Sequence, residues 1–117
     1  MNRIPVDQSG MTFHVVSVGP NLDDNKQQKV NDEGVPVWSI QCLHMPEQVG
    51  DYVPKGQVEA VRVPARTEPK VDKFSEVKFV NLVARPWSMN GRSGVSLSAD
   101  AVADAKTGAL PAIDGGK

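Results

Sequence analysis

The chain has little cysteine and few aromatic residues: Cys42 is the single cysteine in 117 residues, and aromatics make up 5% of the sequence. A lone cysteine rules out a disulfide within the chain, and its place inside an apolar run favours a reducing compartment, so we expect a cytoplasmic protein. No window reaches the roughly 18 apolar residues of a membrane span, and the N-terminus lacks the apolar core of a signal peptide. We therefore expect one domain of ordinary size and no membrane partner.

The sequence also lacks the ligand spacing of a metal site. His14 and His44 are the only histidines, and neither has a cysteine or carboxylate at the distance that a zinc site requires. The acidic pairs Asp23-Asp24 and Asp32-Glu33 do not follow the spacing of an EF-hand loop. We interpret these acidic pairs as solvated loop charge and expect no metal and no cofactor.

Catalytic motifs are missing as well. The serines at 93, 96 and 98 lack a G-x-S-x-G elbow, and no histidine follows them in the chain. The Gly-Arg-Ser-Gly run at 91–94 lacks the lysine of a phosphate-binding P-loop. The sequence therefore favours a binding protein over an enzyme.

The net charge of −1 shows no excess of either sign, but the charges are unevenly distributed. Residues 55–92 contain eight basic and four acidic residues, a balance of +4, so the rest of the chain sums to −5. A basic middle between acidic ends is compatible with a positive groove for a polyanion. Chance segregation of solvated charges gives the same pattern, and charge alone leaves both interpretations open.

Hydrophobic alternation and turn residues predict an all-β chain of five strands. The predicted strands are Met11–Val18, Val35–His44, Gln57–Pro64, Phe74–Ser88 and Ser93–Val102. Residues 21–34 are polar and predict a long hairpin connection or a mobile flap, whereas residues 65–72 are too short and polar for a packed helix. Five strands without such a helix fit a small OB-like barrel better than a sandwich.

The strand patterns also predict which side chains face the core. Trp38, Ile40 and Cys42 share one face, and Asn90-Gly91 is the strongest hairpin signal. The near-continuous apolar run at 77–84 indicates burial on both faces or a bulge that changes the inward-facing residues. We expect the domain to span 11–102, with flexible ends at 1–10 and 103–117.

Two segments, GVPVWSIQCLH and VKFVNLVARPWSMNGRSGVSLSADAV, resemble OB-fold single-stranded DNA-binding proteins. The chain is similar to small actinobacterial proteins found with plasmids, prophages and conjugative elements, and more distantly to the helix-destabilising proteins of filamentous phages. The resemblance covers roughly residues 11–102. It implies a DNA-binding protein of replication or conjugation that coats strands cooperatively as a dimer; whether RNA is also bound stays open.

The candidate binding residues are aromatic rings that stack on bases and cations that neutralise phosphates. The stacking candidates are Trp87, Trp38 and Tyr52, and the phosphate candidates are Arg62, Arg66, Lys78, Arg85 and Arg92. Trp87 can instead close the barrel end, and the face of Trp38 favours the core. The rival function is a protein–protein interaction module of a replication or conjugation complex, because edge strands and aromatic anchors also dock proteins.

Overall fold

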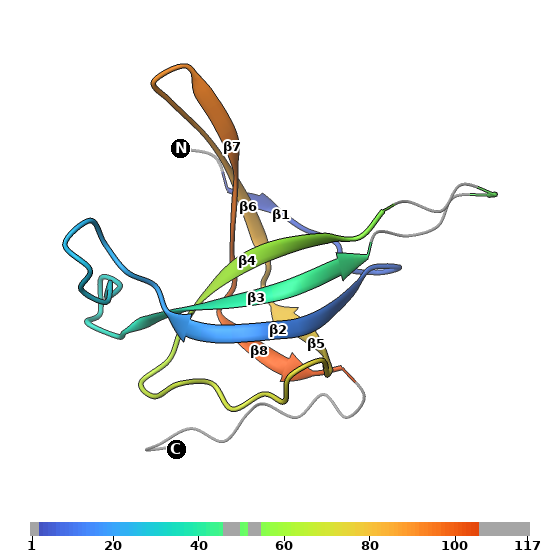
Figure 1. The fold of residues 1–117 in the computed structure, drawn as a ribbon, viewed down its shortest axis with the longest axis horizontal. Helices are drawn as coiled ribbons and strands as arrows, with labels where there is room; N and C mark the ends of the chain where they lie inside the picture. The colour runs from blue at the N-terminus through green and yellow to red at the C-terminus, as the bar shows by residue number, and fades with distance from the viewer. Residues whose placement is uncertain (1–2, 46–49, 52–54, 106–117) are drawn as a thin grey trace.

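A computed structural model describes residues 3–45, 50–51 and 55–105, and in these residues every regular element is a β-strand (Figure 1). The strands are β1 (Ile4–Pro5), β2 (Thr12–Pro20), β3 (Val37–Met45), β4 (Gln57–Pro64), β5 (Glu76–Val80), β6 (Val83–Met89), β7 (Arg92–Ser98) and β8 (Ala101–Asp104). The all-β prediction is confirmed, and so is the predicted lack of a helix between β4 and β5.

The eight strands form one curled sheet in the order β1-β6-β7-β4-β3-β2-β5-β8. Strands β2, β3 and β4 form an antiparallel meander, β4 pairs in parallel with β7, and β2 pairs antiparallel with β5. The remaining long strands form one hairpin, with β5 and β6 in its first arm and β7 and β8 in its second arm. Because β7 pairs with β6 and β8 pairs with β5, this hairpin connects β4, at one side of the meander, to β2, at the other side. The result is a small OB-like barrel, as the sequence predicts.

The structure has eight strand segments where the sequence predicts five, and most of the difference comes from one hairpin. The register is continuous along it, since Ala84 lies opposite Leu97 and Phe79 lies opposite Val102. Each arm is interrupted at the same level, so β5 and β6 form one arm and β7 and β8 the other. The short β1 accounts for the remaining segment.

The interruption changes which residues face the core. Asn81 adopts a positive φ of 54°, and its side-chain amide donates a hydrogen bond to Asp100 on the other arm over 2.8 Å. Before Asn81, the buried residues are the odd-numbered Val77 and Phe79. After Asn81, the buried residue is the even-numbered Leu82, so the inward-facing positions shift by one residue. The apolar run at 77–84 therefore reflects a change of face, the second of the two predicted explanations.

The core fills the inside of the barrel with apolar side chains from β2, β3, β4, β5 and β8, and with Leu82 and Ala99 from the breaks in the two hairpin arms. Its members are Phe13, Val15, Ile40, Cys42, Val61, Val63, Val77, Phe79, Leu82, Ala99 and Val102. Phe13 and Phe79 meet edge to face at 5.3 Å between ring centroids. Burial raises the pKa of the Cys42 thiol to about 12, which keeps it protonated at neutral pH.

Both ends predicted to be flexible contribute to the barrel. The Val6 amide donates to the Leu82 carbonyl, and the Gln8 side chain exchanges two hydrogen bonds with the Phe79 backbone, at 2.7 and 2.9 Å. At the other end, β8 continues to Asp104 and buries Ala103. The rest of the predicted C-terminal tail, residues 106–117, lies outside the described residues.

The hairpin turn has the predicted form. Asn90 and Gly91 have φ values of 55° and 78°, and they link the paired residues Met89 and Arg92. Two consecutive positive φ values in a two-residue loop define a type I′ turn, which matches the twist of the strands. The β6–β7 ribbon therefore continues as a regular hairpin and projects beyond the barrel (Figure 1).

Candidate nucleic-acid interface

The outer face of the β6–β7 ribbon presents a basic and small-residue surface. Leu97 packs against the core, so its neighbours along the strand, Ser96 and Ser98, face outward. The register places Arg85 opposite Ser96 and Val83 opposite Ser98 on this outer face. By the same alternation, the next outward-facing pairs toward the hairpin turn are Trp87 with Gly94 and Met89 with Arg92.

The parallel pairing of β4 with β7 extends this surface across the barrel. Arg62 lies beside Ser98 on one side and beside Ser39 of β3 on the other. The neighbours of Arg62 on β4, Val61 and Val63, are buried in the core, so the Arg62 side chain faces outward. Three of the predicted phosphate-binding residues, Arg62, Arg85 and Arg92, therefore share one face.

A further arginine joins them from the N-terminus. In the β1–β6 pair, Ile4 lies opposite Ala84, so Arg3 lies beside Arg85 on the same face. Both arginines line one cavity of about 440 Å³ together with the loop residues Asn31, Asp32 and Glu33. We call the surface formed by Arg3, Arg62, Arg85, Trp87 and Arg92 the arginine face. Arg3 is not among the predicted site residues, because a two-residue strand has no periodicity that predicts its pairing.

Trp87 lies flat on the ribbon, against its cross-strand partner Gly94. A Cβ atom at position 94 would lie 2.8 Å from Cζ2 and 3.0 Å from Cε2 of the indole, so glycine is what allows the ring this close. The side chain is 42% exposed, which leaves much of its surface open to solvent. Trp87 is thus a half-exposed aromatic on the arginine face and not a plug at the barrel end.

Trp38 and Tyr52 do not contribute to this face. Trp38 alternates with the buried Ile40 and Cys42, and its indole Nε1 donates a hydrogen bond to the Ala65 carbonyl over 2.8 Å. That bond ties the start of the β4–β5 connector to the barrel, so the geometry of Trp38 fits the core interpretation. Tyr52 lies outside the described residues.

The last two predicted site residues, Arg66 and Lys78, lie away from the arginine face. Arg66 is exposed in the connector, two residues after β4 ends. Lys78 is half-buried on β5, whose neighbours are β2 and β8, and its Nζ donates to the Met11 carbonyl over 3.3 Å. The strand register brings neither residue beside Arg62 or Arg85.

The polar loop 21–36, between β2 and β3, is closely hydrogen-bonded. Isolated bridges join Leu22 to Gln28 and Val30 to Pro36, so the loop has the character of a hairpin connection. At its tip, the Asn31 side-chain oxygen accepts from the amides of Glu33 and Val35, both over 2.9 Å. These bonds fix the conformation of the acidic tip, which shares the lining of the cavity with Arg3 and Arg85.

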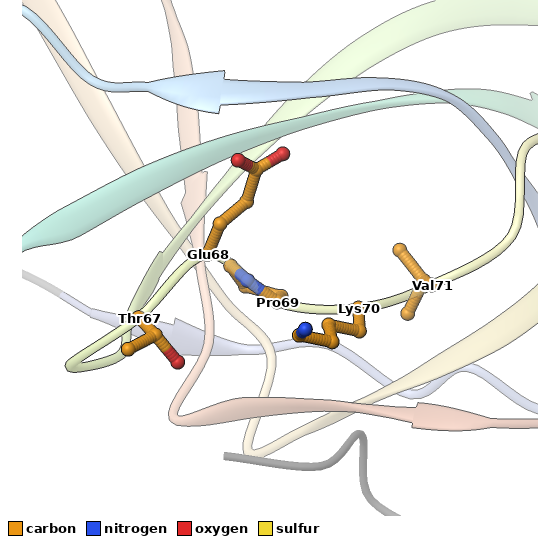
Figure 2. Close-up of a pocket in the computed structure, with 5 residues that line it drawn as sticks. All are labelled: Thr67, Glu68, Pro69, Lys70 and Val71. Atoms are coloured by element: carbon orange, nitrogen blue, oxygen red, sulfur yellow. The ribbon is translucent and has the colours of Figure 1, made fainter. Parts of the chain in front are cut away.

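Another hollow, of about 470 Å³, follows the β4–β5 connector (Figure 2). It is lined by Thr67, Glu68, Pro69, Lys70 and Val71, all from one chain segment. One acid and one base from the same loop give no concentration of charge, and no aromatic ring lines it. The arginine face is the better candidate because residues from three strands, β4, β6 and β7, and Arg3 from the N-terminus converge on it.

In the described residues, no group of three or more histidine, cysteine, aspartate or glutamate side chains is placed to hold a metal ion. The same part of the chain contains no helix that is long and apolar enough to cross a membrane. Comparisons with protein-family models, with curated proteins and with solved structures find no match for this chain. A functional assignment must therefore start from the fold and the arginine face.

Proposed function

We propose that the protein binds single-stranded DNA with little sequence preference. The observation that supports this most is the strand register, which gathers Arg62, Arg85, Arg92 and the half-exposed Trp87 on one outer face of an OB-like barrel. OB folds bind oligonucleotides on the face of their second and third strands and on the loops after the first and fourth strands. In this barrel Arg62 lies on the third long strand, β4, whereas Arg85, Trp87 and Arg92 lie on the two strands that flank the second of these loops. Here the flanking loops are 21–36 and the Asn90-Gly91 turn.

Each residue type on the arginine face has a role in such a complex. The guanidinium groups of Arg62, Arg85 and Arg92 donate to phosphate oxygens along a strand that crosses β4, β7 and β6. Trp87 stacks on a base, which does not depend on base identity. The small side chains of β7 between them leave room for the sugar and backbone of the strand.

We place this activity in the cytoplasm, in the replication or transfer of a mobile element, as the family resemblance implies. The protein would coat or present a single strand, without a chemical reaction and without a cofactor, and a homodimer would extend the bound length. RNA offers the same phosphates and bases, so it is a second ligand to be measured.

A protein-interaction module is the second candidate, and the β6–β7 ribbon favours it. In the described residues, β1 covers the outer edge of β6 only as far as Ala84, and the backbone edge beyond it is open for strand addition. Met89 and Val95 on the ribbon are 67% and 59% exposed. An edge strand with exposed apolar side chains is a common docking surface for a partner protein.

Binding of a fluorescent oligo-dT strand, measured by anisotropy, distinguishes the two functions. A DNA-binding protein gives saturable binding of the strand, weaker binding of a duplex of the same length, and a marked loss of affinity in Trp87→Ala. The matched control is Phe74→Ala, which removes another exposed aromatic ring, 69% exposed, from the β4–β5 connector. If no strand binds at low salt, the interaction module becomes the better account.

A further inference from the structure

The cavity between the acidic loop tip and β1–β6 has a composition that differs from the rest of the arginine face. Its charged lining consists of two arginines, Arg3 and Arg85, and two carboxylates, Asp32 and Glu33, so its formal charge is zero. A phosphate in this cavity would meet as many anionic as cationic groups. The cavity is therefore a poorer phosphate site than a purely basic hollow would be, although Arg85, which lines it, also belongs to the proposed phosphate path.

The volume and lining of the cavity fit a neutral polar group that both donates and accepts hydrogen bonds. About 440 Å³ lies within the usual range of small-ligand sites, roughly 300–1,000 Å³. Guanidinium groups only donate hydrogen bonds and ionised carboxylates only accept them. The ligand must thus offer acceptors on one edge and donors on another.

Guanine meets this requirement better than the other bases. Its O6 and N7 atoms accept the two parallel bonds of an arginine fork, and its N1–H and amino group form an adjacent donor pair for a carboxylate. Cytosine and adenine offer one amino group as donor, and thymine offers one ring N–H. We propose that Arg3 with Asp32 or Glu33 forms a guanine-selective subsite beside the phosphate path.

Hydrogen bonds within the loop hold the backbone that carries the two carboxylates. The Asn31 side chain binds the backbone amides of Glu33 and Val35, and Gly34 adopts a positive φ of 77°, which closes the turn. These contacts use the backbone of the tip, so the carboxylates of Asp32 and Glu33 are not consumed by them. The fixed backbone limits the positions that these two exposed side chains can reach, which lowers the conformational entropy lost when a base binds.

The subsite deepens the proposed function and rests on it. Phosphate contact and stacking on Trp87 would hold any sequence, while one position of the bound strand would prefer guanine. Arg85, shared between the cavity and the rest of the arginine face, lies two residues from Trp87 on the same strand face. A guanine in the cavity would therefore be close to the base stacked on the indole.

The test compares oligo-dT strands of about 12 nucleotides, within the usual range of site sizes, that carry one central guanine, cytosine, adenine or hypoxanthine. Guanine is expected to tighten binding about 5- to 150-fold over thymine, the discrimination of one good bidentate pair. Hypoxanthine, which lacks the amino group but keeps O6, N7 and N1–H, should lose part of this gain and bind between guanine and thymine. Asp32→Asn with Glu33→Gln and, separately, Arg3→Gln should each lower the guanine-to-thymine ratio, because each change removes one of the two contacts to guanine. Asp24→Asn, which removes a carboxylate of the same loop from outside the cavity lining, should keep the ratio.

Equal affinity for guanine and thymine strands would overturn the subsite while leaving the proposed function intact. So would a doubly neutralised variant that binds every strand more tightly by the same factor, since the carboxylates would then only repel DNA. If no strand binds at low salt, the proposed function itself fails.

Discussion

Replacing Arg62 by glutamine tests whether the arginine face holds phosphates. Arg62 lies between Ser39 and Ser98, at the point where the meander meets the ribbon. Each neutralised phosphate of a single strand contributes about 0.7 to the slope of log affinity against log salt. Three contacts, from Arg62, Arg85 and Arg92, give a slope of about 2.1, so raising salt from about 50 to about 200 mM weakens binding about 20-fold.

The Arg62→Gln variant should lower that slope to about 1.4, and the same change of salt should then weaken binding only about 7-fold. Anisotropy titrations of oligo-dT at four salt concentrations measure the slope directly. Lys70→Gln is the matched control, because it removes the same charge from the connector, which lies on the opposite side of the molecule from the ribbon (Figure 1). An unchanged slope in Arg62→Gln, or an equal reduction in Lys70→Gln, would refute the phosphate path.

Three more expectations concern the framework. Gly94→Ala should displace the Trp87 indole, since the new Cβ would lie 2.8 Å from it, and the tryptophan emission spectrum should shift relative to the native protein; an unchanged spectrum would contradict the packing described. Trp38→Phe removes the indole hydrogen bond to Ala65 and should cost about 0.5–1.5 kcal/mol in urea unfolding, with the salt slope of DNA binding unaltered. Cys42 is buried, with its thiol pKa raised to about 12, so its reaction with a thiol reagent at pH 8 should follow the rate of unfolding; rapid labelling of the native protein would argue against a closed barrel.

Local patterns in the sequence predicted the meander well. The bounds of β4 match the predicted Gln57–Pro64, and the buried and exposed faces of β3 and β4 follow the predicted alternation. The Asn90-Gly91 turn was equally predictable. These features depend on short-range rules, namely the period of two in a strand and the φ values that a tight turn demands.

Features that depend on distant pairing were harder to predict. The change of face at Asn81 requires a partner, Asp100, on the other arm, and the apolar run alone allowed two explanations. Arg3 reaches the arginine face only because two residues of the N-terminus add to the edge of β6. The acidic loop tip lines a cavity only because the fold brings it close to Arg3 and Arg85, and the composition of the loop does not predict that contact.

The grouping of arginines was predictable in part. The sequence placed Arg62, Arg85 and Arg92 in one basic stretch, and the register puts all three on one face. Lys78 belongs to the same stretch, but it lies before the change of face, on a strand that pairs with β2 and β8. The number of charges in a stretch of sequence does not distinguish Lys78 from the three arginines, whereas strand pairing does.

The most direct test of the central claim uses Trp87 as the reporter of binding. In Trp38→Phe it is the sole tryptophan of the chain, so its fluorescence reports the arginine face alone. Titration with oligo-dT and with a duplex control, at low and at moderate salt, should give saturable quenching by the single strand only, reversed as salt rises. Unchanged fluorescence with both ligands at low salt would contradict the account and direct the search to protein partners of the β6–β7 ribbon.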